Sequence, residues 1–224
     1  MIVFSQGSCR IGFPLTYLHC RKKIELIDPH WDSVENDIGK VPPMALGHFH
    51  NIYDHLRVFQ LLQDDSDNKE LMQVLNQINR LPVRKSNRNR LDWKETWEHC
   101  KNKFVGCDIA VIEMSSFNSV SSLNGPNVSD LEEIVKYMQE IESLIPHCKK
   151  LWVCHYRPGV IWNKNHKSSR ETLYRAVAHM EHYFDPSPFL AKDEKNLMRD
   201  TKHYSPYGIK FIAERMLEKM ESMK

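Results

Sequence analysis

The chain has 224 residues, a net charge of +2 and 41% hydrophobic residues. These values are ordinary for a globular protein with a substantial core, and a charge so near zero gives no reason to expect a nucleic-acid partner. No apolar run reaches about 18 residues, so no membrane span is predicted. No signal peptide is visible at the start, which makes the cytoplasm the expected location.

The six cysteines predict neither a metal site nor a disulfide framework. They form no Cys-x-x-Cys pair, and none has a histidine at a spacing typical of zinc sites. Free thiols in a reducing compartment are the simplest interpretation. We therefore expect a protein that needs no metal and no cofactor.

The chain begins with a short apolar run, Ile2 to Phe4, that reads as a strand and ends in a polar turn. Gly7 permits a tight turn, and Ser8 can cap the helix that follows. Ser8 thus lies at the carboxyl end of the first strand. In open α/β sheets this edge is where ligands bind.

The middle of the chain alternates between strands and helices. Residues 23–28 read as a second strand. Gly47 comes just before a helix that runs to about residue 63, and the free backbone N–H groups at the start of that helix can bind an anion. Residues 108–114 are the clearest buried strand, and Asn118 ends the turn after it. Later come a capping box from residue 129 to 132 and its helix, a strand over 150–155, a helix over 171–182 and a short strand over 182–185.

The end of the chain carries an Asp-x-x-His pattern, Asp200 and His203, just before an amphipathic helix. Ser205 can cap that helix and Pro206 suits its first turn. A carboxylate three residues before an imidazole in such a turn can bind one ring nitrogen and leave the other to act as a base. The alternative is a polar helix entry with a surface ion pair.

Strands that alternate with helices, each strand ending in a polar turn, predict a parallel sheet covered on both faces. The expected fold is a three-layer α/β/α sandwich built as one domain over residues 1–224. In this fold the turn at Ser8 and the turn at Asn118 lie at the same sheet edge.

Ser8 after the first strand, with Asp200 and His203 before the last helix, resembles the SGNH or GDSL-type hydrolase superfamily. That resemblance implies a flavodoxin-like sheet, Ser8, Asp200 and His203 as a catalytic triad, and oxyanion donors at Gly47 and Asn118. The first block departs from the Gly-Asp-Ser of that family and is closer to a GSCFA-type branch. In one register Ser8 is the nucleophile; in the other it is Cys9.

Two functions fit these residues. The first is a serine esterase or acyltransferase that acts through an acyl-enzyme on a small-molecule, carbohydrate or small lipid ester, with O-acetylated carbohydrate suggested by the resemblance. The second is a non-catalytic ligand- or carbohydrate-binding module on the same fold, because a fold does not guarantee its chemistry. The sequence sets neither the acyl acceptor nor the oligomeric state.

Overall fold

The computed structural model describes residues 1–27, 50–64, 69, 93–119, 125–154, 164–199 and 203–224. In chain order its elements are β1 (Ile2–Gln6), α1 (Cys9–Cys20), β2 (Glu25–Ile27), α2 (Ile52–Gln63), α5 (Trp93–Phe104), β3 (Ile109–Glu113), α6 (Leu131–Leu144), β4 (Lys149–Val153), α7 (Lys164–Ala178), β5 (Tyr183–Phe184), α8 (Ser187–Leu197) and α9 (Pro206–Ser222).

The five strands form one sheet in the order β2-β1-β3-β4-β5, and every neighbouring pair is parallel. This is the strand order of flavodoxin-like sheets, so the α/β fold class predicted from the sequence is confirmed. β1 lies between β2 and β3, and its residue Gln6 pairs with Ile112 of β3. The turns after β1 and β3, which carry Ser8 and Asn118, therefore lie at the same edge of the sheet, as predicted.

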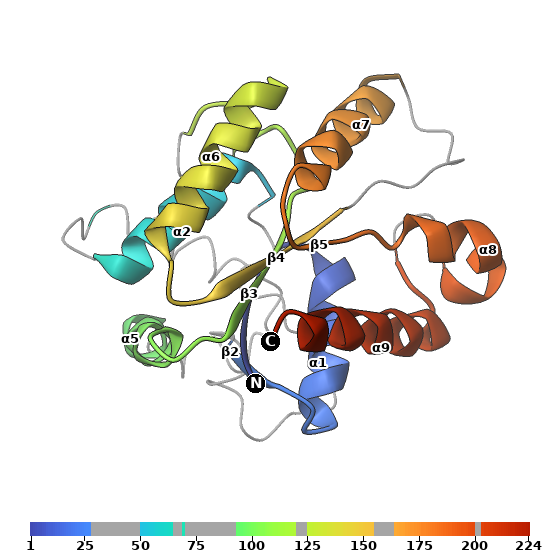
Figure 1. Cartoon of the computed structure of the whole chain (residues 1–224), viewed down its shortest axis with the longest axis horizontal. Helices are drawn as coiled ribbons and strands as arrows, with labels where there is room; N and C mark the ends of the chain where they lie inside the picture. The colour runs from blue at the N-terminus through green and yellow to red at the C-terminus, as the bar shows by residue number, and fades with distance from the viewer. Residues whose placement is uncertain (28–49, 65–68, 70–92, 120–124, 155–163, 200–202) are drawn as a thin grey trace.

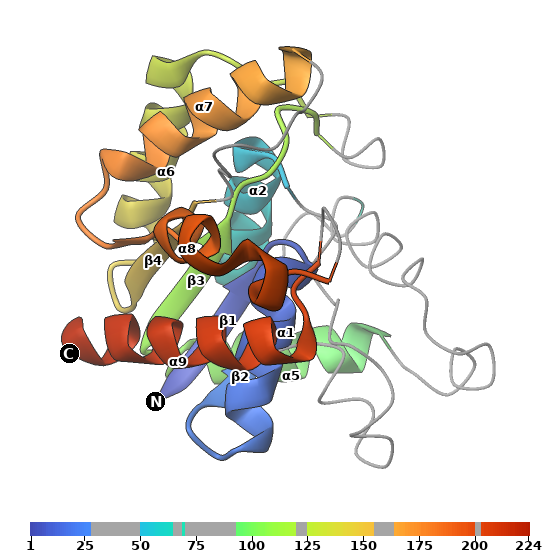
Figure 2. The same cartoon turned by 90° about the vertical axis from the view of Figure 1, so that its right-hand side faces the viewer.

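Side chains alternate between the two faces of the sheet and supply two separate cores. Phe4, Ala110 and Ile112 pack with α2, α5, α6 and α7 on one face. Val3 and Val111 pack with α1, α8 and α9 on the other face. Figures 1 and 2 show the two sets of helices on opposite sides of the strands, which gives the predicted three layers.

Side chains cap the N-termini of α1, α6 and α9. Ser8 accepts the Arg10 N–H at the start of α1, and Ser205 accepts the Gly208 N–H at the start of α9, both as predicted. The cap of α6 was placed one residue too early: Asp130, rather than the serine before it, accepts the first N–H groups. The sequence reading also left out α8, which starts after Pro186.

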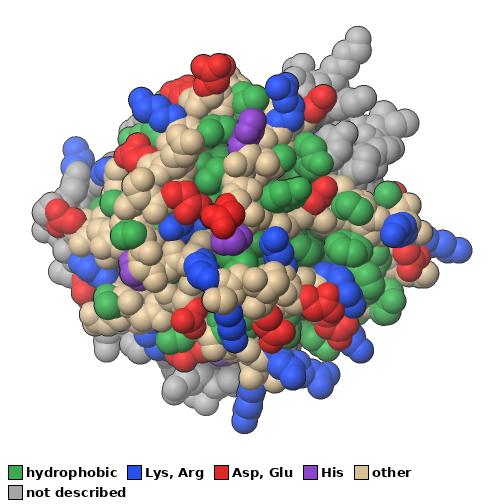
Figure 3. Space-filling view, viewed as in Figure 1, with side chains coloured by type: hydrophobic (Ala, Val, Ile, Leu, Met, Phe, Trp, Pro, Cys, Tyr) green, Lys and Arg blue, Asp and Glu red, His purple; other side chains and the backbone are tan. Residues whose placement is uncertain are grey.

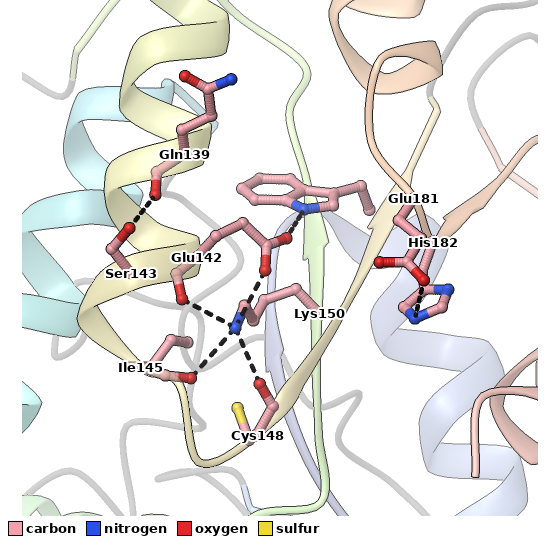
Figure 4. Close-up of polar contacts among 9 residues, drawn as sticks. Gln139, Glu142, Ser143, Ile145, Cys148, Lys150, Glu181 and His182 are labelled. Carbon is pink, nitrogen blue, oxygen red and sulfur yellow. Dashed lines mark hydrogen bonds and ion pairs between the residues drawn. The ribbon is translucent and has the colours of Figure 1, made fainter.

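A buried lysine joins the end of α6 to β4. Lys150 Nζ donates to the carbonyl oxygens of Glu142, Ile145 and Cys148 at 3.0–3.1 Å, and it lies 3.0 Å from the carboxylate of Glu142 (Figure 4). The other carboxylate oxygen of Glu142 accepts the indole N–H of Trp152 at 2.8 Å. The ammonium therefore bonds carbonyl groups of the last turn of α6 and of the connection between α6 and β4.

In the part of the chain that the structure describes, every helix is too short or too polar to cross a bilayer.

Candidate functional site

The carboxyl edge of the sheet gathers polar side chains that are almost completely buried. Gln6 ends β1, Glu113 ends β3, and His55 and Asp54 lie in the first turn of α2; each of these four side chains is 0% exposed. Burying polar and charged groups costs free energy unless they are paired. Their concentration at one edge marks this edge as the candidate site.

Ser8 is half-buried at this edge and its hydroxyl has two described partners. The hydroxyl donates to Glu113 Oε2 at 2.5 Å and accepts the Arg10 N–H at 3.2 Å. The backbone N–H of Ser8 also donates to Glu113 Oε2, at 2.8 Å. One carboxylate oxygen therefore accepts both hydrogens that Ser8 can donate.

Glu113 is the site residue that sequence reasoning missed. It is the last residue of a strand whose five positions are all buried, and its neighbours along the strand are apolar. The available signal was a charged residue that closes an otherwise apolar run, Ile-Ala-Val-Ile-Glu, at a ligand-binding sheet edge. Strand alternation puts Glu113 on the same face as Val111, toward α1 and α9.

Gly7 explains how Glu113 reaches Ser8. Since Gln6 pairs with Ile112, the next positions along the two strands are Gly7 and Glu113. A Cβ atom at Gly7 would lie 2.7 Å from Glu113 Cβ and 2.8 Å from Ile11 Cδ1, and the φ of Gly7 is +154°. Only glycine fits this turn without strain, so Gly7 allows the close approach of Ser8 to the carboxylate.

On the other face of the sheet His55 links the ends of β1 and β3. Its Nδ1 lies 2.7 Å from Gln6 Oε1 and its Nε2 lies 3.1 Å from the Glu113 carbonyl oxygen. Burial, and then the neighbouring His50, lower the pKa of His55 from 6.5 to about 3. The ring is therefore neutral and donates only once, from Nε2 to the carbonyl.

That assignment requires the Gln6 amide to present its NH₂ group to Nδ1, since a ring nitrogen without hydrogen only accepts. The Nε2 of Gln6, as placed, is buried without a described partner, which agrees with an amide turned the other way. His55 thereby holds the backbone of Glu113 from the sheet face opposite its side chain.

The exit loop of β3 is tied to the start of α2. The backbone carbonyl of His50 accepts the N–H groups of Ser115 and Ser116, and the Asn51 side-chain amide donates to the Phe117 carbonyl. Asn118, predicted as an oxyanion donor, lies in this loop with an exposed side chain, and its backbone N–H donates to Ser116 Oγ at 2.9 Å. The loop is held in place, with Asn118 at its surface.

His203 lies shortly before α9, beside a short antiparallel bridge. The Arg199 N–H donates to the His203 carbonyl at 2.9 Å, and Met198 forms an antiparallel bridge with Tyr204. The His203 side chain is half-buried. Asp200 lies outside the described residues, so its pairing with His203 stays a prediction.

A narrow crevice lies beside Glu113 at the carboxyl edge of the sheet. Arg10, Glu113, Cys154 and Tyr204 are among its lining residues, and it is too narrow to hold a water molecule. Tyr204 is the direct neighbour of His203, and Glu113 is bonded to Ser8. Glu113 and Tyr204 thus line one crevice, and the contact between Ser8 and His203 stays a prediction.

The remaining predicted positions are less completely described. Cys9 is the first residue of α1, and its side chain lies outside the described part of the structure. Gly47 also lies outside the described residues. Their proposed roles, a nucleophile and an oxyanion donor, stay predictions.

Basic side chains add positive charge near the same edge. Arg10, 6% exposed, belongs to the first turn of α1, and Arg170 comes from α7. Burial, and then the nearby Arg10 guanidinium, lower the pKa of Arg170 to about 10. Arg170 is therefore still charged at neutral pH, and the two cations favour negative charge at this edge.

A larger cavity lies elsewhere, between α6 and the turn that leads into β5. Its volume is about 350 Å³, and Gln139, Glu142, His179, Glu181 and His182 are among its lining residues. Figure 4 shows Glu181 and His182 on the segment that faces α6. This cavity shares no lining residue with the crevice beside Glu113, so the two are separate. Among the described residues, no three His, Cys, Asp or Glu side chains are arranged to hold a metal ion.

Comparisons with known proteins give no family assignment. No family model matches the sequence, and no curated protein matches it. The fold is similar to a crystal structure of an acetyl xylan esterase, AlAXEase, with a TM-score of 0.45 and 14% sequence identity. The similarity covers 97% of this chain and 98% of that chain. A TM-score this low carries no inference about activity, so the chemistry has to be argued from the residues at the sheet edge.

Proposed function

We propose that the protein is a serine esterase or acyltransferase that uses Ser8 as its nucleophile. The observation that supports this is the Ser8 hydroxyl, half-buried at the carboxyl edge of β1 and donating to a buried carboxylate at 2.5 Å. A serine needed only to cap α1 requires no such partner. Tyr204, the residue after His203, lines the same crevice as Glu113.

In the proposed reaction the Ser8 hydroxyl first turns its hydrogen from Glu113 to His203. Ser8 Oγ then attacks the carbonyl carbon of an ester while His203 takes the serine proton. His203 returns that proton to the departing alcohol, and Asp200 holds the ring and stabilises its cation. Gly47 and Asn118 are the proposed donors to the oxyanion. The acyl group then passes from Ser8 to water, which makes a hydrolase, or to a sugar hydroxyl, which makes a transferase.

The experiment is hydrolysis of p-nitrophenyl acetate by the wild type and by Ser8→Ala. We expect Ser8→Ala to lose nearly all activity, because no other hydroxyl can form the acyl-enzyme. Ser143→Ala is the matched control, since this exposed helix serine bonds only its own helix carbonyl. The Ser8 change should cost about 1–3 kcal/mol in unfolding free energy through the lost cap and carboxylate contact, measured by thermal unfolding.

Cys9→Ala separates the two registers. If Ser8 is the nucleophile, Cys9→Ala stays active, like Cys20→Ala at the exposed end of the same helix. The nucleophile would instead be Cys9 if Cys9→Ala is inactive, Ser8→Ala is active and iodoacetamide inactivates the protein. If no variant changes a measurable rate, the binding module becomes the better description of the protein.

A further inference from the structure

The carboxylate of Glu113 stands where packing alone favours an apolar side chain. Its strand neighbour on the same face is Val111, and Val153, Ile212 and Met216 line the same crevice. Burying a carboxylate there costs free energy that a leucine would not. A residue that breaks the local packing rule at a ligand edge points to a functional role.

We infer that Glu113 is the positioning residue for the Ser8 hydroxyl, an inference that rests on the proposed function. Its Oε2 receives the hydroxyl at 2.5 Å and the backbone N–H of the same serine at 2.8 Å, so it fixes both the rotamer and the turn. A single carboxylate oxygen accepts both hydrogens because its charge strengthens each bond. Glu113 touches Ser8 rather than substrate, so it acts through the nucleophile.

Glu113 is itself held from two sides. The Gly7 backbone lies close against the Glu113 side chain, because a Cβ atom at Gly7 would lie 2.7 Å from Glu113 Cβ and 3.2 Å from its Oε2. The His55 ring binds the Glu113 carbonyl from the other face of the sheet. A nucleophile that is held this way keeps its oxygen in one place, and a displacement of about 1 Å can cost about 100-fold in rate.

The test measures the reactivity of Ser8 directly with a fluorophosphonate, alongside hydrolysis of p-nitrophenyl acetate. In the labelling reaction Ser8 Oγ forms a bond to phosphorus, fluoride leaves, and the serine proton passes to the base. We expect Glu113→Gln and Glu113→Asp to lower the labelling rate and kcat by at least about tenfold, with KM changed less than about twofold. The amide lacks the charge, and the aspartate is one methylene too short. Glu221→Gln, on an exposed face of α9, is the control and keeps the wild-type rate.

A merely structural role predicts a different result. Glu113→Gln would then lower the midpoint of thermal unfolding, while the folded protein would label at the wild-type rate; that outcome overturns the inference and leaves the proposed function intact. If the wild type is not labelled at Ser8, or Ser8→Ala is fully active, the proposed function fails and the inference fails with it.

If neither variant folds, the wild type supplies the readout. The ¹H–¹⁵N resonance of the Ser8 amide reports protonation of Glu113, because that N–H is bonded to the carboxylate. We expect the labelling rate to fall on acidification in two steps, one as His203, the proposed base, takes a proton and one with the same midpoint as the shift of this resonance. A Ser8 amide that does not respond to pH, or a rate with no fall at the midpoint of that shift, overturns the inference.

Discussion

His55 makes the stability of the protein depend on pH. The ring is fully buried, and its pKa is lowered to about 3. Between about pH 3 and 6.5 the unfolded chain binds a proton that the folded chain does not, so the unfolding free energy falls as the pH falls through this range. One proton contributes about 1.4 kcal/mol per pH unit.

We therefore expect His55→Gln to flatten the pH dependence. Urea unfolding of the wild type and the variant between pH 4 and 6 measures the two slopes, and the wild-type slope should be steeper by about 1.4 kcal/mol per pH unit. The variant is also less stable at pH 7, because the contacts with Gln6 and the Glu113 carbonyl change. Equal slopes would show that the ring is charged in the folded protein.

The sequence predicts single residues well where a local rule is at work. Ser8 and Ser205 were predicted as helix caps, and both accept the expected N–H groups, because capping depends only on the next few residues. Glu113 was missed, since its role depends on a pairing between residues 105 positions apart in the sequence. The contact between Ser8 and His203 is of the same long-range kind and stays a prediction.

At the scale of elements, Lys150 secures the connection between α6 and β4. Replacing it with methionine keeps most of the apolar stem but leaves three buried carbonyl groups and one side of the Glu142 carboxylate without the ammonium. We expect Lys150→Met to lower the unfolding free energy by about 2–3 kcal/mol, measured by urea unfolding.

Lys136→Met is the matched control for that change, because Lys136 lies on the exposed face of α6. Its substitution should stay within about 0.5 kcal/mol of the wild type. If the two variants lose the same amount of stability, the Lys150 network contributes nothing beyond the general effect of removing a surface charge.

The long, periodic elements were predictable and the short, irregular ones less so. β3 has five consecutive buried positions, and α9 has a regular apolar stripe. The sequence predicts both elements. α8 was left out because its Asp193 has non-helical backbone angles, which interrupt its periodicity. Its start does carry a signal: Asp185 accepts the Ser187 N–H beside Pro186.

At the scale of the whole molecule, the two faces of the sheet depend on different parts of the chain. One face is covered by α2, α5, α6 and α7, and the other by α1, α8 and α9. Charged side chains of both signs are interspersed over the visible surface in Figure 3, and hydrophobic side chains gather over part of it. Tyr207, Phe189 and Phe211 form an aromatic cluster where α8 meets α9.

A chain that ends before α9, at residue 205, should leave one face of the sheet open. α9 buries Ile212, Ala213, Met216 and Met220 against α1 and the strands. We expect the shortened chain to bind the dye ANS and to associate, because the exposed apolar face exceeds what monomeric proteins tolerate. ANS fluorescence and sedimentation measure this. A shortened chain that stays monomeric and binds no ANS would contradict the two-core description.

The position of β1 has a consequence for how the protein is made. Of the five strands of this sheet, the first to be synthesised is an inner strand, and its partner β3 begins only at Ile109. At roughly 5–20 residues per second, translation takes about 5–20 s to supply that partner. During this interval the apolar faces of β1 have no β3 beside them, and α9, which begins at Pro206, covers α1 later still. The nascent chain is therefore a natural client for a chaperone that shields Val3 and Phe4 until the sheet can form around them.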